Sequence, residues 1–148
     1  MTKTQQIISM AKEIAGATPD FHKIKGPGTG DKANHAFMAT LRSRAKGTFG
    51  RDYAEKQISG DIKSAVDFYI PEEKTIIEVA LTLRVPLSEF QKDIFKALLA
   101  RDNGVDVEDL VFLAKLGARK RHQEPASQAI IHWLRRHYSI NVTIEELK

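Results

Sequence analysis

Two apolar runs separated by a short polar break stand out in the hydrophobic pattern of this chain. The first covers 65–70 and the second 75–83, and each contains a single acid among mainly β-branched, aromatic and aliphatic residues. The break, 71–74, is short enough for a hairpin turn. With its two central residues in the turn, the register places Asp67 directly opposite Glu78, on one face of the hairpin.

The remaining pattern predicts helices around a mixed sheet. The nearly continuous apolar run 109–117 is typical of a strand that is buried on both faces and parallel to its neighbour. Ser88 and Gln91 match a capping box at the start of the preceding helix. Phe95 and Trp133 are expected in the core. We expect helices at 4–15, 32–46, 88–102 and 124–137, further strands at 53–59 and 139–144, the latter at an edge, and a glycine-rich loop at 19–30.

The two acids of the hairpin require an explanation, because like charges directly opposite each other destabilise a strand pair. A divalent cation bound between Asp67 and Glu78 would offset this repulsion. Hard cations take carboxylate oxygens and keep positions open for a phosphate group. The alternative is that one acid is exposed at an edge and the other is hydrogen-bonded within the protein.

An acid in one strand, an acid in the next and a following helix with the sequence FQKDIFKALLA resemble the PD-(D/E)XK nuclease superfamily. Asp67 matches the first motif acid and Glu78 the acid of the (D/E)XK half-motif, whereas Ala80 stands where the motif normally has Lys. The resemblance covers roughly 53–138. It implies a restriction-endonuclease-like α/β fold, with a three-stranded meander, a helical crossover and further strands in one sheet.

The chain length predicts one domain, 1–148, and the pattern divides it into a helical N-terminal part, 1–50, and a nuclease-like α/β core, 51–148. The resemblance implies metal-dependent hydrolysis of phosphodiester bonds by a DNA endonuclease of restriction-enzyme type. A chain of this size would act as a homodimer to cut both strands of a duplex.

The resemblance also implies roles for individual residues. Asp67, Glu78 and the carbonyl group of Val79 would hold Mg²⁺, or Mn²⁺ in its place. Some members of the superfamily carry the catalytic lysine on the helix after the hairpin. Lys92 is therefore the first candidate for the catalytic cation, and Lys96 is the second.

Ala80 leaves two other interpretations open. In one, the chain is a catalytically inactive nuclease-like domain that binds nucleic acid or a protein partner. In the other, it is a small α/β domain whose acids are structural and whose role is protein interaction. Metal binding would separate the nuclease from the second of these, and cleavage would separate it from both.

The net charge of +4 permits nucleic-acid binding, so the distribution of basic residues matters more than their sum. One cluster lies at the end of the second expected helix. The other lies in an expected loop after the strand at 109–117, at the sheet edge where open α/β folds bind ligands. The candidate nucleic-acid contacts are Arg42, Arg44, Lys46, Arg119, Lys120 and Arg121.

Other classes of protein are disfavoured by what the sequence lacks. Without cysteine there is no disulfide framework, thiolate zinc site or cysteine nucleophile. No apolar run approaches the ~18 residues that a membrane span needs. The expected location is therefore cytoplasmic, with no membrane partner.

Overall fold

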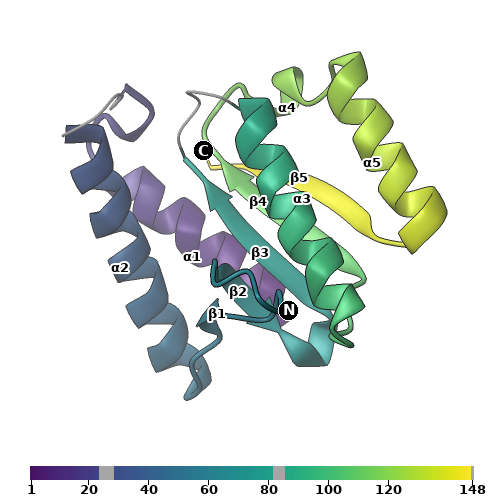
Figure 1. Cartoon of the computed structure of the whole chain (residues 1–148). Helices are drawn as coiled ribbons and strands as arrows, with labels where there is room; N and C mark the ends of the chain where they lie inside the picture. The colour runs from purple at the N-terminus through teal and green to yellow at the C-terminus, as the bar shows by residue number, and fades with distance from the viewer. Residues whose placement is uncertain (24–28, 82–85, 148) are drawn as a thin grey trace.

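Five strands form a single mixed sheet at the centre of the molecule (Figure 1). The computed structural model describes residues 1–23, 29–81 and 86–147. Strands follow one another across the sheet in sequence order, the first three antiparallel and the last three parallel. Their bounds are β1 Ala54–Lys56, β2 Val66–Ile70, β3 Thr75–Ala80, β4 Asp109–Ala114 and β5 Asn141–Glu146. This mixed sheet with an antiparallel meander, a parallel crossover strand and a final edge strand is the arrangement that the sequence predicts.

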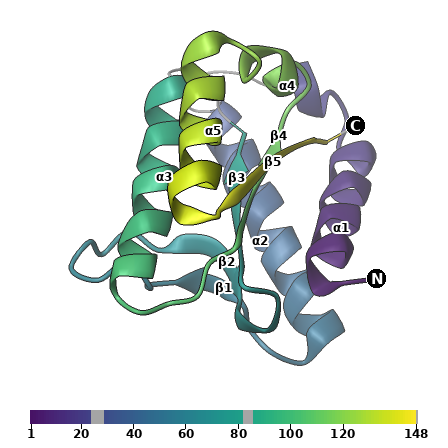
Figure 2. The same cartoon turned by 90° about the vertical axis from the view of Figure 1, so that its right-hand side faces the viewer.

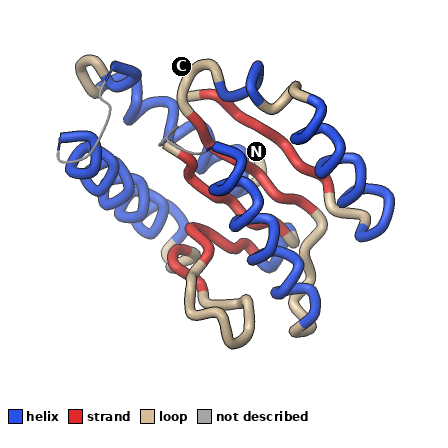
Figure 3. The backbone as a smooth tube through the Cα atoms, turned by 45° about the horizontal axis from the view of Figure 1, so that its top comes forward, coloured by secondary structure: helices blue, strands red, loops and turns tan. Residues whose placement is uncertain are grey.

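Helices cover both faces of the sheet, as the edge-on view in Figure 2 shows. Two helices from the N-terminal third lie on one face, and two from the C-terminal half lie on the other (Figures 2 and 3). The helices are α1 Lys3–Ala17, α2 Thr29–Phe49, α3 Pro86–Asp102, α4 Ala118–Arg121 and α5 Pro125–Tyr138, with 3₁₀ turns at Phe21–Lys23 and Pro71–Glu73. The structure is therefore α/β with a mixed sheet flanked by helices. Among the described residues, no helix combines the length and apolar character that crossing a bilayer requires.

The alternation of side chains along the strands divides the core into two layers. Phe68 and Ile77 pack with α1 and α2, whereas Ile76, Leu110 and Phe112 pack with α3 and α5. Because successive strand residues point to opposite faces, Glu78 shares the face of Ile76 and lies under α3. A carboxyl group is thereby placed inside an apolar layer.

The hairpin has the register that the sequence predicts. Tyr69 pairs with Ile76 and Phe68 with Ile77, which brings Asp67 opposite Glu78 one step further on. The turn itself differs from a two-residue loop. It is the 3₁₀ turn Pro71–Glu73, closed by Lys74 in the left-handed conformation with φ of 50°. The four-residue connection still preserves the pairing.

Several local predictions were wrong. α3 begins at Pro86, so Ser88 lies inside its first turn and is not the N-cap. Phe95 is 61% exposed and Trp133 is 39% exposed. The sheet covers only one face of each helix, and the adjacent residues Ile94 and Leu134 occupy that face. Phe95 and Trp133 come directly next to these two core positions in the sequence and therefore point toward solvent.

Two further predictions concern segments between elements. Arg119, Lys120 and Arg121 were expected in a loop but lie in the single helical turn α4. Part of the expected glycine-rich loop, 24–28, and the expected strand end at 82–83 lie outside the described residues.

Candidate active site

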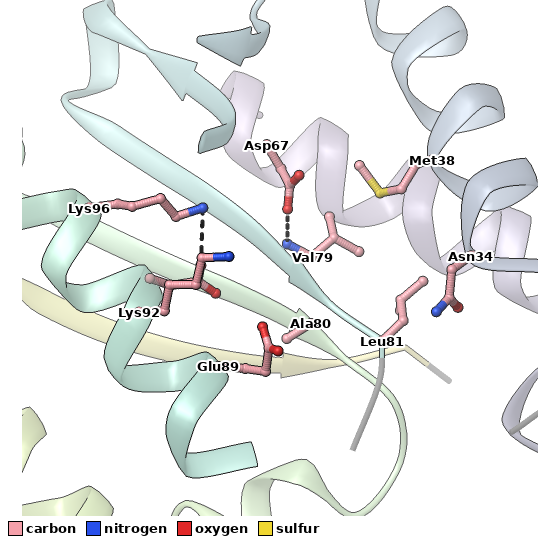
Figure 4. Close-up of a pocket in the computed structure, with 10 residues that line it drawn as sticks. Asn34, Met38, Asp67, Val79, Ala80, Leu81, Glu89, Lys92 and Lys96 are labelled. Carbon is pink, nitrogen blue, oxygen red and sulfur yellow. Dashed lines mark hydrogen bonds and ion pairs between the residues drawn. The ribbon is translucent and has the colours of Figure 1, made fainter. Parts of the chain in front are cut away.

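A pocket of about 220 Å³ lies where β2 begins and β3 ends (Figure 4). α2 lines it from one helical layer and α3 from the other, so it reaches across the end of the strand pair. The lining residues are Asn34, Met38, Asp67, Val79, Ala80, Leu81, Glu89, Lys92, Asp93 and Lys96. Asp67, Val79 and Lys92 are thus in the same pocket, together with the second lysine candidate, Lys96.

The two strand acids are each fixed to the backbone of the opposite strand. The Asp67 N–H donates to Glu78 Oε1 at 2.7 Å, and the Val79 N–H donates to Asp67 Oδ2 at 2.7 Å. Figure 4 shows the Asp67 carboxylate pointing toward Val79. These side-chain bonds continue the pairing of β2 and β3 past the last backbone pair. Asp67 faces the pocket, whereas Glu78 is only 1% exposed and lies behind it.

Lys96 contacts the buried acid. Its ammonium group lies 2.6 Å from Glu78 Oε2 and 3.1 Å from Asp93 Oδ1, and it donates to the Ala65 carbonyl at 3.1 Å. The contact with the Ala65 carbonyl is a hydrogen bond, and the contacts with the two carboxyl groups are ion pairs. The Glu78 oxygen is paired by charge and makes no directed hydrogen bond among the described residues. Figure 4 shows Lys96 extending from α3 toward the strands.

The surroundings shift the acid–base properties of this cluster. Burial raises the pKa of Glu78 to about 9, and the neighbouring Asp93 and Asp67 carboxyl groups act in the same direction against the Lys96 ammonium. Burial also raises the pKa of Asp67, although the Val79 N–H and the charges of Lys96 and Arg42 oppose this. Burial alone would lower the pKa of Lys96, but Glu78 and Asp93 outweigh it and raise that pKa. Strongly perturbed groups in and behind a pocket are typical of functional sites.

The shifted pKa of Glu78 predicts how stability depends on pH. Between the ordinary glutamate pKa of 4.5 and the folded-state pKa of about 9, the folded protein retains a proton that the unfolded chain releases. The free energy of unfolding should therefore fall as pH rises through this window. Glu78→Gln removes this titration, so its stability should decrease less between pH 5.5 and pH 8. Urea unfolding of both proteins at several pH values tests this, and parallel curves would contradict it.

The structure distinguishes the two lysine candidates by their contacts. Lys92 lines the pocket but is exposed, and it makes no ion pair among the described residues. Lys96, one helical turn further on, reaches the strand acid. The sequence does not distinguish the two lysines, because Glu89 precedes Lys92 by three residues as Asp93 precedes Lys96.

The carboxylate oxygens of this site are ligands of the kind that a magnesium ion takes. Mg²⁺ binds proteins through one or two carboxylates and fills its other positions with water and phosphate oxygens. Asp67 and Glu78 meet that requirement. Within the described ranges, no group of three or more His, Cys, Asp or Glu side chains converges on one point. A cation would also have to separate Glu78 from Lys96.

Two of the three basic candidates on α2 are held by acids. Arg42 pairs with Glu55 at 3.1 Å and Arg44 with Glu13 at 2.6 Å, while Lys46 is exposed. Arg42 follows Met38 by four residues and therefore lies on the helical face that lines the pocket. Of this cluster, Arg42 is the residue that lies toward Asp67, whose pKa its charge influences.

The basic residues of α4 have different surroundings. Arg119 donates through Nε to the Ile144 carbonyl of β5 at 3.0 Å and lies 3.5 Å from Glu145. Arg119 is thus attached to the edge strand. Lys120 and Arg121 are exposed and make no ion pair within the part of the chain that the structure describes.

No protein-family model, curated protein or solved structure matches this chain. The arrangement of Asp67, Glu78 and Lys96 is therefore the basis on which a function can be proposed.

Proposed function

We propose that this protein is a metal-dependent nuclease with a restriction-endonuclease-like fold, which hydrolyses phosphodiester bonds in DNA in the cytoplasm. One observation carries the proposal. Two carboxylates lie opposite each other on adjacent antiparallel strands, and a lysine from the next helix contacts one of them beside a pocket. Lys96 would then supply the cation that Ala80 cannot.

Each residue of the candidate site would have its own role in the reaction. Asp67 and Glu78, with the backbone of Val79, would hold Mg²⁺ or Mn²⁺. When bound, such an ion lowers the pKa of a water molecule and stabilises charge on the scissile phosphate. The Lys96 ammonium would orient the attacking water or neutralise charge that develops on the phosphate oxygens. Lys92, at the pocket surface, would contact a neighbouring phosphate.

A homodimer is part of the same proposal. A duplex has two strands of opposite direction, and a twofold-symmetric pair of chains would present one site to each strand. A monomer would instead be expected to nick.

Cleavage of labelled nucleic acids tests the proposal and its substrate class. Single- and double-stranded DNA and RNA of one sequence are incubated with the protein and Mg²⁺, Mn²⁺ or EDTA, and the products are separated on denaturing gels. We expect metal-dependent cutting of DNA. Cutting of RNA alone would change the substrate, and cutting that persists in EDTA would contradict metal dependence.

One observation favours a second candidate, the catalytically inactive nuclease-like domain. Lys96 already pairs with the buried acid, so the folded protein needs no metal to stabilise Glu78. In this case the chain would bind nucleic acid or a protein partner without cutting. Tight binding of DNA with no cleavage in either metal would favour this candidate.

The proposed DNA contacts give a prediction that does not depend on cleavage. Replacing both Lys120 and Arg121 by Ala should weaken DNA binding and reduce the salt dependence of log K by about 2, because each phosphate contact contributes about 0.9. Arg119→Ala should change the salt dependence much less, since Arg119 is attached to Ile144 and Glu145. Fluorescence anisotropy titrations in EDTA at several salt concentrations measure this. Equal effects of the two variants would contradict these assignments.

A further inference from the structure

Asp93 contacts the proposed catalytic lysine and has no place in the mechanism above. Its Oδ1 lies 3.1 Å from Lys96 Nζ, and it lines the same pocket. The side chains of Asp93 and Lys96 are only 14% and 10% exposed. The pair is thus largely removed from water, unlike the exposed ion pairs that contribute little.

The three partners of Lys96 are not equivalent in the proposed reaction. Glu78 would be drawn to the metal, so its contact with the ammonium cannot be relied on during the reaction. The Ala65 carbonyl and Asp93 would then remain. A lysine side chain has four flexible carbons and loses considerable entropy when it is fixed, and one carbonyl contact leaves the ammonium free to pivot.

We propose that Asp93 is a positioning residue, whose carboxylate holds the Lys96 ammonium in place while the site is loaded. This inference rests on the proposed nuclease function. Asp93 is placed for the role because it precedes Lys96 by three residues on one rigid helix, so the two side chains share a helical face. Asp93 also interacts with Glu78, but its contact with Lys96 is made within α3 and does not pass through the strands.

Steady-state cleavage by Asp93→Asn tests the inference. The change keeps the size of the side chain and removes its charge. We expect kcat to fall on the order of 10- to 100-fold, since small misplacement of a reacting group has effects of this size, while KM stays within about twofold. Asp93→Glu, which restores a carboxylate, should recover part of the lost kcat. The matched control is Asp102→Asn on the exposed end of α3, which should behave as wild type.

A second readout does not use activity. In a ¹H–¹⁵N correlation spectrum, a lysine ammonium group gives a signal only when hydrogen bonding and burial slow the exchange of its protons with water. We expect the metal-free wild type to show a signal that disappears in Lys96→Met and is therefore assigned to Lys96. The signal should weaken or vanish in Asp93→Asn and persist in Asp102→Asn. If Asp93→Asn does not fold, Asp93→Ser replaces it in both experiments.

The outcomes separate this inference from the function on which it rests. If the wild type does not cut nucleic acid with either metal, the proposed nuclease function fails and the positioning role of Asp93 in cleavage fails with it. If the wild type cuts and Asp93→Asn has the same kcat, the inference alone is overturned. A kcat for Asp93→Asn above that of the wild type would also overturn it, because Asp93 would then compete with the substrate for Lys96.

Discussion

Asp67→Asn and Glu78→Gln are each expected to lower metal-dependent cleavage by at least about 10³-fold. Each change removes a carboxyl group that would have to ionise to bind the metal, while retaining an oxygen acceptor. The bound ion contributes several kcal/mol of transition-state stabilisation, and each 1.36 kcal/mol corresponds to about a factor of ten in rate. Loss of either carboxylate should therefore remove most of the activity.

These two substitutions are chosen so that the fold survives. An Asn at 67 can still accept the Val79 N–H, and a Gln at 78 can still accept the Asp67 N–H. Glu108→Gln is a suitable control, because Glu108 is exposed and pairs only at the surface with Lys74. Circular dichroism and urea unfolding verify the fold, and initial cleavage rates report the effect. Activity within tenfold of wild type in either site variant would contradict the assigned metal ligands.

Lys96→Met should have the second largest effect, with cleavage reduced by roughly 10²-fold or more, the range typical of a positioned acid–base or charge-stabilising group. Lys92→Met should lower cleavage by only about tenfold or less, mainly through KM, because Lys92 is exposed and makes no ion pair with an acid among the described residues. The comparison is direct, since both lysines lie on α3 and line one pocket. Steady-state kinetics of the two variants measure the difference.

Lys96→Met should also destabilise the protein, because Glu78 and Asp93 would lose their cation inside the fold. Breaking a buried ion pair by removing one partner typically costs about 3–5 kcal/mol. Urea unfolding therefore accompanies the kinetics, which are measured at a temperature where both variants are folded. If Lys92→Met lowered the rate of cleavage more than Lys96→Met, Lys92 would be the catalytic lysine instead.

The sheet and the pairing of the acids could be predicted because they depend on local pattern. Period-two alternation and a short break were enough to set Asp67 against Glu78, and a buried apolar run after a helix was enough to predict the parallel strand. These features depend on residues that are close together in the sequence and on the handedness that all chains of L-amino acids share. They can therefore be predicted without the structure.

The features that could not be predicted depend on contacts between distant segments. Lys92 and Lys96 have the same chemistry and the same helix, and only the packing of α3 on β3 determines which lysine reaches Glu78. Phe95 and Trp133 are apolar but fall just outside the covered helical faces. The sequence predicts that Arg119 is free to contact DNA, yet in the structure its Nε donates to the Ile144 carbonyl, 25 residues away.

The measurement that tests the central claim most directly is nicking of supercoiled plasmid in Mg²⁺ and in Mn²⁺, with wild type beside Asp67→Asn and Glu78→Gln. We predict that wild type converts the plasmid to nicked or linear forms with metal and not with EDTA, and that both variants leave it supercoiled. A folded wild type that binds the plasmid but never cuts it would contradict the nuclease proposal and favour a domain that binds nucleic acid without cleaving it.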